Sequence, residues 1–163
     1  MNPVHLHLVI IHLPIFGSLL GAFVLAYGLW TSSNTTKMAA YYLLVISAIG
    51  AGIAYFTGEG AEEAVEDIPG VVEKLIKEHE DFAMFALISL LILGAAALLA
   101  LYLTYKNSRS SKLVSVVTLL IALISFGLVA RTGYLGGKIR HTELGMTNVQ
   151  KAAGIQKEGK END

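Results

Sequence analysis

The sequence contains no cysteine, and this absence excludes several kinds of site at once. Disulfides, thiolate metal ligands, cysteine-held iron–sulfur clusters, covalently attached c-type haem and thiol nucleophiles all require that residue. Charge is also scarce, because only 15% of the residues are charged, against roughly a quarter in soluble domains. The formal net charge is −1, so the chain lacks the basic field that binds nucleic acid.

Basic residues are missing from the beginning of the chain, since no Lys or Arg precedes Lys37. A secretory signal carries basic residues ahead of its apolar run, so we expect the first apolar run to stay in the protein. The local motifs of common enzymes are absent as well: there is no P-loop, dinucleotide fingerprint, GxSxG elbow or HExxH. Whether the chain is an enzyme therefore stays open.

Apolar residues dominate what is present, at 54% of the chain, and the mean hydropathy is +0.59. They form long runs that reach the roughly 20 residues a helix needs to cross a hydrocarbon core of about 30 Å. Backbone polar groups need partners in lipid, which favours helices. The predicted helices cover residues 3–30, 38–57, 70–105 and 113–136. The predicted fold class is all-α: an integral membrane four-helix up-down bundle.

The loop between the second and third helices has a composition of its own. Residues 58–81 hold nine acidic and two basic residues. Within them, "GAEEAVEDIPG" predicts a short acidic helix closed by Pro69 and Gly70, so the loop is expected to be partly helical. We predict one membrane domain over residues 1–146 and a polar, disordered tail over residues 147–163.

Charge also predicts the topology. The two short turns "TSSNTTK" and "KNSRSSK" contain basic residues and no acidic ones, whereas the central loop is acidic. We therefore predict a multi-pass protein of the inner (cytoplasmic) membrane, and the positive-inside rule places both turns in the cytoplasm. The N-terminus, the central loop and the C-terminal tail are then extracytoplasmic. The basic residues of the tail argue the other way.

Histidines and carboxylates gather at the extracytoplasmic end of this predicted bundle. In an up-down arrangement, one side of the membrane holds four helix ends. These are the starts of the first and third helices and the ends of the second and fourth. The histidines near these ends are His5, His7, His12, His79 and His141, and the carboxylates include Glu59, Glu63, Glu80 and Glu143. This convergence predicts a polar cluster at one mouth of the bundle.

His12 is the strongest candidate for a functional residue. His5 and His12 lie seven residues apart, hence on one helical face and about 10 Å from each other along the axis. His7 points elsewhere. A polar side chain about two turns deep in the membrane needs a partner, so we expect His12 to face the bundle. Pro14 removes a backbone donor just beyond it and predicts a kink.

One hypothesis is a b-type haem held by two imidazoles for quinol-linked membrane electron transfer. The candidate cofactor-binding residues are His12, His79 and His141, with Arg140 or Arg131 to pair with the propionates. Arg131 lies within the fourth apolar run and needs a partner or access to the interface.

A second hypothesis is a non-haem site for Zn, Fe, Mn or Cu, built from imidazoles and carboxylates. The candidate metal ligands are His12, His79, His141, Glu59, Glu63, Glu80 and Glu143. A third hypothesis is a non-catalytic accessory subunit of a membrane redox complex, with a partner protein docked on the acidic loop. Gly17 and Gly21 form a GxxxG pair, which is typical of close helix packing and leaves homo-oligomerisation open.

Three segments resemble an uncharacterised bacterial family of four-helix membrane domains. They are "HLPIFGSLLGAFVL", "TGEGAEEAVEDIPGVVEKLIKEHEDFA" and "GYLGGKIRHTE", and the resemblance reaches to about Glu143. It implies the four-helix fold, and the family pattern falls on His12, Glu59, His79 and His141. Some relatives are fused to a Rieske iron–sulfur domain, which implies a redox setting, although this chain carries no such domain.

Overall fold

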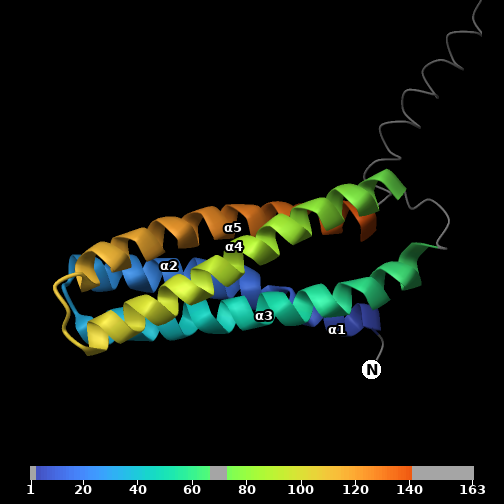
Figure 1. The fold of residues 1–163 in the computed structure, drawn as a ribbon. Coiled ribbons are helices and arrows are strands. Elements are labelled where there is room, and N and C mark those ends of the chain that lie inside the picture. The colour runs from blue at the N-terminus through green and yellow to red at the C-terminus, as the bar shows by residue number, and fades with distance from the viewer. Residues whose placement is uncertain (1–2, 67–72, 141–163) are drawn as a thin grey trace, which may run out of the picture.

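The computed structural model describes residues 3–66 and 73–140, and these residues form helices joined by short turns, without strands. Figure 1 shows the long helices lying side by side in one bundle. In chain order the helices are α1 (Pro3–Ile10), α2 (His12–Trp30), α3 (Asn34–Glu66), α4 (Glu73–Tyr105) and α5 (Ser111–Arg140). The predicted all-α architecture is therefore confirmed.

The first apolar run is divided at Ile11, which separates α1 from α2. Pro14 has no N–H to donate to the carbonyl of Ile10, and its ring crowds that carbonyl. The break is small, because the N–H of Ile11 still donates to the carbonyl of His7 at 3.0 Å. On the N-terminal side of the break, α1 packs against α3 (Figure 1). The predicted interruption near Pro14 is thus present, and it sets the direction of the segment that carries His7.

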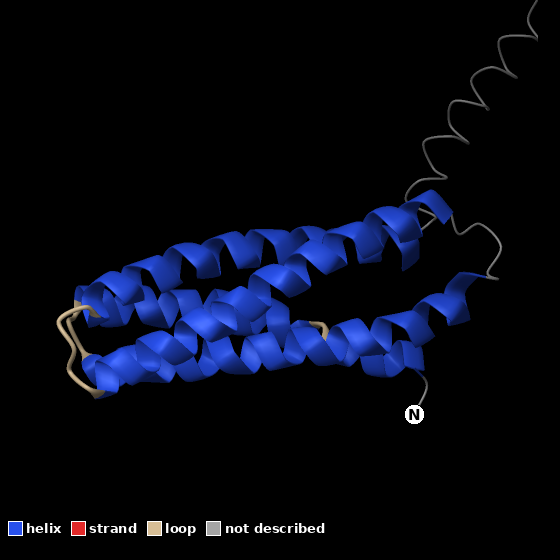
Figure 2. Ribbon diagram, in the orientation of Figure 1, coloured by secondary structure: helices blue, strands red, loops and turns tan. Residues whose placement is uncertain are grey.

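The helices α2 to α5 form a closed ring of neighbours. Contacts join α2 to α3, α3 to α4 and α4 to α5, and α2 also packs on α5. Figure 2 shows two tan turns at one end of the bundle, each joining two antiparallel helices. Among the described residues, four spans are long and apolar enough to cross a membrane, namely His5–Trp30, Asn34–Gly58, Lys74–Tyr105 and Ser111–Lys138. This is the up-down arrangement that the sequence predicts.

Large apolar side chains point outward and small ones fill the interior. Phe23 and Phe85 are 65% and 60% exposed, whereas Ala40, Ala97 and Ala122 are fully buried. A soluble bundle would hide its large apolar residues, so this distribution fits an exterior that faces lipid. Buried hydroxyls find partners inside the bundle: the hydroxyl of Ser47 on α3, for example, donates to the carbonyl of Pro14 at 3.0 Å.

The GxxxG pair of α2 is used within the chain. A Cβ atom added to Gly17 would lie 2.9 Å from the Cβ of Ser47, and one added to Gly21 would lie 2.5 Å from Leu44 Cδ2. Both glycines therefore allow α2 and α3 to approach closely. The glycine face that could have served homo-oligomerisation is occupied by the protein's own α3. It is therefore not available for self-association.

The loop after the second span is partly helical, as predicted, and two helices extend beyond their predicted ends. The acidic segment after the second span is not a separate short helix, because α3 runs without interruption to Glu66. Ala and Glu are strong helix formers, and no Pro occurs in this stretch to stop the helix. At the other end, α5 continues past residue 136 to Arg140. The predicted tail over residues 147–163 lies outside the described residues.

Candidate functional site

His7 is the histidine of the first apolar span that faces the bundle. It is half-buried, and its Nδ1 lies 3.0 Å from the carbonyl oxygen of Ala54 on α3. The hydroxyl oxygen of Thr57 lies 3.2 Å from the same nitrogen. Because a carbonyl oxygen only accepts, Nδ1 carries the proton and donates it to Ala54. This contact fixes the imidazole of His7 on the surface of α3.

His79 is held in a similar way between α4 and α5. It is half-buried near the start of α4, and its Nδ1 lies 3.0 Å from the carbonyl oxygen of Thr132 on α5. Again the carbonyl requires a protonated Nδ1. Two imidazoles are thus each anchored to the backbone of a neighbouring helix, His7 on α3 and His79 on α5.

Each ring also rests on a glycine four residues beyond its carbonyl partner. A Cβ added to Gly58 would lie 3.5 Å from Cε1 of His7, and one added to Gly136 would lie 3.1 Å from Cε1 of His79. In a helix, the carbonyl of residue i already accepts from the N–H of residue i+4. A second donor must approach over residue i+4, where a glycine leaves room. Both histidines therefore contact a glycine in this way, but only at Gly136 would a Cβ crowd the ring.

The anchored tautomer leaves Nε2 for another partner. In a neutral imidazole one nitrogen donates and the other keeps a lone pair. When Nδ1–H is bonded to a backbone carbonyl, Nε2 is the nitrogen with the lone pair. This hydrogen bond is the one that commonly orients histidines that bind metal through Nε2. His7 and His79 both have this arrangement, which suits them to bind a metal ion or a haem iron.

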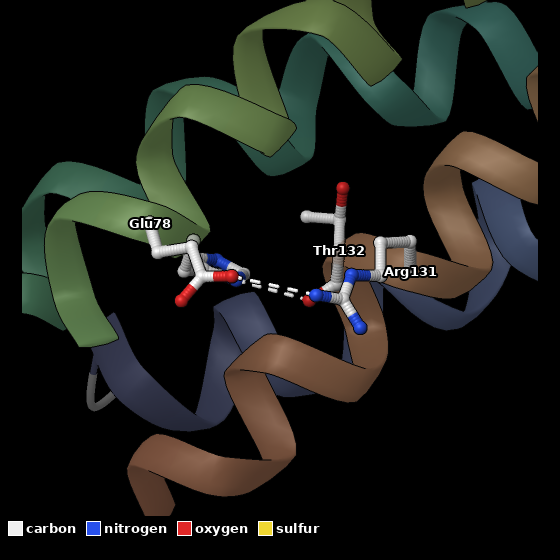
Figure 3. A network of polar contacts seen from close by, with 4 residues as sticks. Glu78, Arg131 and Thr132 are labelled. Carbon is white, nitrogen blue, oxygen red and sulfur yellow. Dashed lines mark hydrogen bonds and ion pairs between the residues drawn. The ribbon is translucent and has the colours of Figure 1, made fainter.

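An ion pair stands directly beside the His79 contact. Arg131 Nη2 of α5 lies 3.4 Å from Glu78 Oε1 of α4. Figure 3 shows Glu78 and Arg131 pointing toward each other, with Thr132 next to them. The guanidinium also lies over the ring of Phe82, at 5.5 Å from its centroid, and over that of Tyr134, at 5.6 Å. The arginine within the fourth span therefore has its partner, and α4 is fastened to α5 at the mouth.

The expectation that His12 faces the bundle is wrong. His12 is exposed, and its Nδ1 donates to the carbonyl of Leu8 in the preceding turn, at 2.7 Å. Its ring stacks on Phe16, at 6.1 Å between centroids. His5, which shares its face by spacing, is exposed too. A role for His12 as a ligand remains a prediction, but it would have to act toward the outside of the bundle.

The other predicted ligands are divided between described and undescribed parts. Glu80 is exposed on α4, beside His79 in sequence. The side chains of Glu59 and Glu63 on α3 and of Arg140 at the end of α5 lie outside what is described, as do His141 and Glu143 entirely. Among the residues that the structure does describe, no three His, Asp or Glu side chains converge as a metal site.

Comparison with known proteins gives the family. No curated protein and no solved structure was found to match the chain. A family model covers nearly all of the membrane domain, including both anchored histidines and their glycines. The chain belongs to the family described as Predicted membrane protein (DUF2231), whose model matches residues 3–148.

Proposed function

We propose that this integral membrane protein binds haem b through His7 and His79 and takes part in membrane electron transfer. The observation that carries the proposal is the shared anchoring of the two rings. Each Nδ1 donates to a backbone carbonyl 3.0 Å away, so each Nε2 has a lone pair to offer. His12 makes the same kind of contact within its own helix, but its ring is exposed, so the proposed first ligand is His7 and not the His12 that the sequence favours.

The number of available ligands favours haem over a non-haem site. A structural or catalytic zinc site takes three or four protein ligands, whereas a haem iron needs at most two. The described residues offer a pair of imidazoles and no group of three metal-binding side chains. Bound haem would supply one-electron redox chemistry. Ligation by two histidines would leave no open position on the iron, which would suit electron transfer rather than oxygen chemistry.

The protein's own residues would position and surround the group. The backbone carbonyls of Ala54 and Thr132 orient the two imidazoles. Gly58 and Gly136 leave space beside the rings. Arg140 lies at the end of α5, close in sequence to Gly136, and remains the predicted partner of the propionates. A membrane quinol is the natural electron donor for such a site, with a redox protein on the acidic side as acceptor.

The experiment is a visible spectrum of the full chain, purified in detergent after expression with a haem precursor. We expect a Soret band in the oxidised protein and sharp α and β bands after dithionite. His7→Ala and His79→Ala should each lose the six-coordinate spectrum. The matched control is His12→Ala, which removes an outward histidine from the same span and should leave the spectrum intact.

Three results would contradict the proposal. The first is a purified protein without a Soret band, and the second is a spectrum that persists in both His7→Ala and His79→Ala. Elemental analysis of the same sample adds the third: stoichiometric zinc, manganese or copper without haem would favour the non-haem site instead. Protein that contains neither group, and that co-purifies with a partner from native membranes, would favour the accessory subunit.

The charge distribution supports a membrane orientation for this site. The two short turns carry four basic residues: Lys37, Lys106, Arg109 and Lys112. The helix α1 and the start of α4, which carry the anchored histidines, lie toward the opposite end of the bundle (Figure 1). We propose that the turns face the cytoplasm and that the histidine end faces outward across the cytoplasmic membrane. The acidic segment between α3 and α4 would then be available to an extracytoplasmic partner.

A further inference from the structure

The end of the bundle opposite the histidines carries a basic depression between the two short turns. Its volume is about 200 Å³, and it is formed where α3 and α5 begin. Three cationic side chains line it, those of Lys37, Arg109 and Lys112. The polar residues of the lining include Asn34 and Ser111. Neither turn contains an acidic residue to neutralise these charges.

Lys37 is the unusual member of this group, because it is only 7% exposed. Its stem packs over α2: a Cβ added to Gly28 would lie 3.0 Å from Lys37 Cγ. The Lys37 ammonium makes no ion pair or hydrogen bond among the described residues. Among those residues, every fully buried side-chain nitrogen has a hydrogen-bond partner, so the ammonium nitrogen of Lys37 is not fully buried. The ammonium therefore opens into the depression. The side chain is largely buried and its charge has no counter-charge among the described residues, so an anion in the depression would be favoured.

The backbone adds positive potential at the same place. The helix α3 has 33 residues and α5 has 30, and both begin at this depression. The start of a helix carries a partial positive charge and unsatisfied N–H groups, which favour anions. Two helix starts and three cationic side chains thus lie around one space.

The depression is also held in shape before any ligand arrives. The amide of Asn34 donates to the side-chain oxygen of Asn107 at 3.2 Å, which ties one turn to the other. Ser111 and Thr104 hydroxyls lie 2.8 Å apart, which fixes the start of α5 on the end of α4. A preformed site loses less conformational freedom on binding.

We propose that this depression is a binding site for a phosphate group. The phosphate is that of an anionic membrane lipid or free inorganic phosphate, and either would bring the missing negative charge to Lys37. The depth in the membrane suits a lipid headgroup, because Trp30 and Tyr105 are strongly exposed where α2 and α4 end. Exposed Trp and Tyr are typical of the membrane interface, where lipid phosphates lie.

The first arm of the test uses lipid. The delipidated full chain in neutral detergent is titrated with phosphatidylglycerol and with phosphatidylcholine of equal chain length, and bound lipid is counted by native mass spectrometry. We expect one phosphatidylglycerol, bound about tenfold or more tightly than phosphatidylcholine. Lys37→Met keeps the stem over Gly28 and removes the charge, and should weaken phosphatidylglycerol about tenfold, as expected for loss of a charge-assisted hydrogen bond.

The matched control is Lys106→Met. It removes one positive charge from the same end of the protein but does not line the depression, and Lys106 lies over the ring of Tyr102 instead. We expect less than about a twofold change in this variant, since the remaining effect is that of an exposed, screened charge. If Lys37→Met fails to fold, Arg109→Gln replaces it, because Arg109 is exposed on the turn.

The second arm uses inorganic phosphate, titrated against sodium chloride at matched ionic strength while the melting temperature is followed. Saturable stabilisation that depends on Lys37 supports free phosphate as the source. Phosphatidylglycerol binding that depends on Lys37 and resists added phosphate supports the lipid. The proposal is overturned if neither probe binds better than its reference, or if Lys37→Met and Lys106→Met behave alike. None of these outcomes depends on whether haem binds at the other end.

Discussion

Arg131 and Glu78 form an ion pair of 3.4 Å between α5 and α4, and the next residue of each helix repeats the connection. Thr132 follows Arg131, and His79 follows Glu78. The Nδ1 of His79 donates to the backbone carbonyl oxygen of Thr132 at 3.0 Å. Two consecutive residues on each helix therefore fix the rotation of α4 against α5. The orientation of the His79 ring is set by this double contact as much as by its own burial.

We expect Arg131→Ala to destabilise the protein more than Glu78→Gln. The ion pair is 45% and 39% exposed at its two side chains, so its net contribution is at most about 1 kcal/mol. Arg131→Ala additionally removes the guanidinium from the rings of Phe82 and Tyr134, each worth about 0.5–1 kcal/mol. The free energy of unfolding in mixed detergent measures both variants. An equal loss would show that the ring contacts contribute nothing.

The membrane architecture could be predicted from sequence because its signals are long and local. Apolar runs of spanning length require helices whatever their partners are, and short basic turns require antiparallel neighbours. The ends were harder to predict. The helix α3 continues to Glu66 because its last turns are rich in Ala and Glu, although their polarity resembles that of a loop.

The candidate site was only partly predictable. His79 was identified, since the stretch before the third span is polar enough to show an apolar face. His7 was missed because the apolar residues of α1 do not gather on one face, so periodicity does not show which face is buried. Its contact with Ala54 depends on the break at Ile11 and on the packing of α1 against α3. Gly58 lies four residues after Ala54, and Gly136 lies four residues after Thr132. These two glycines were the signal in the sequence that could have pointed to the carbonyl partners of the histidines.

Gly136→Ala should disturb His79, whereas Gly137→Ala should not. A Cβ at residue 136 would lie 3.1 Å from Cε1 of His79, so the ring must move by a few tenths of an ångström. A Cβ at residue 137 meets nothing within 4 Å, and the alanine should even favour the helix slightly. The imidazole ¹⁵N resonances of His79, assigned by their loss in His79→Ala, measure the change. Identical spectra for the two variants would refute the close contact.

The proposed orientation can be tested with single cysteines, since the chain has none of its own. Ser110→Cys lies on the turn before α5, and Lys138→Cys lies near its other end; both positions are exposed. We expect a membrane-impermeant maleimide to label residue 138 in intact cells and residue 110 only after lysis, because basic turns stay in the cytoplasm. The reverse pattern would place the histidine end inside.

Gly21→Ala should destabilise the bundle, whereas Gly52→Ala, the matched control on the next helix, should not. A Cβ at residue 21 would lie 2.5 Å from Leu44 Cδ2, and Leu44 is fully buried, so α2 and α3 must separate or Leu44 must leave its rotamer. Overpacking of this kind costs about 1–3 kcal/mol. A Cβ at residue 52 meets nothing within 4 Å. Thermal unfolding in one detergent compares the two variants. If Gly21→Ala is as stable as Gly52→Ala, the contact between α2 and α3 is looser than these distances require, and the GxxxG pair is again free to serve contacts outside the chain.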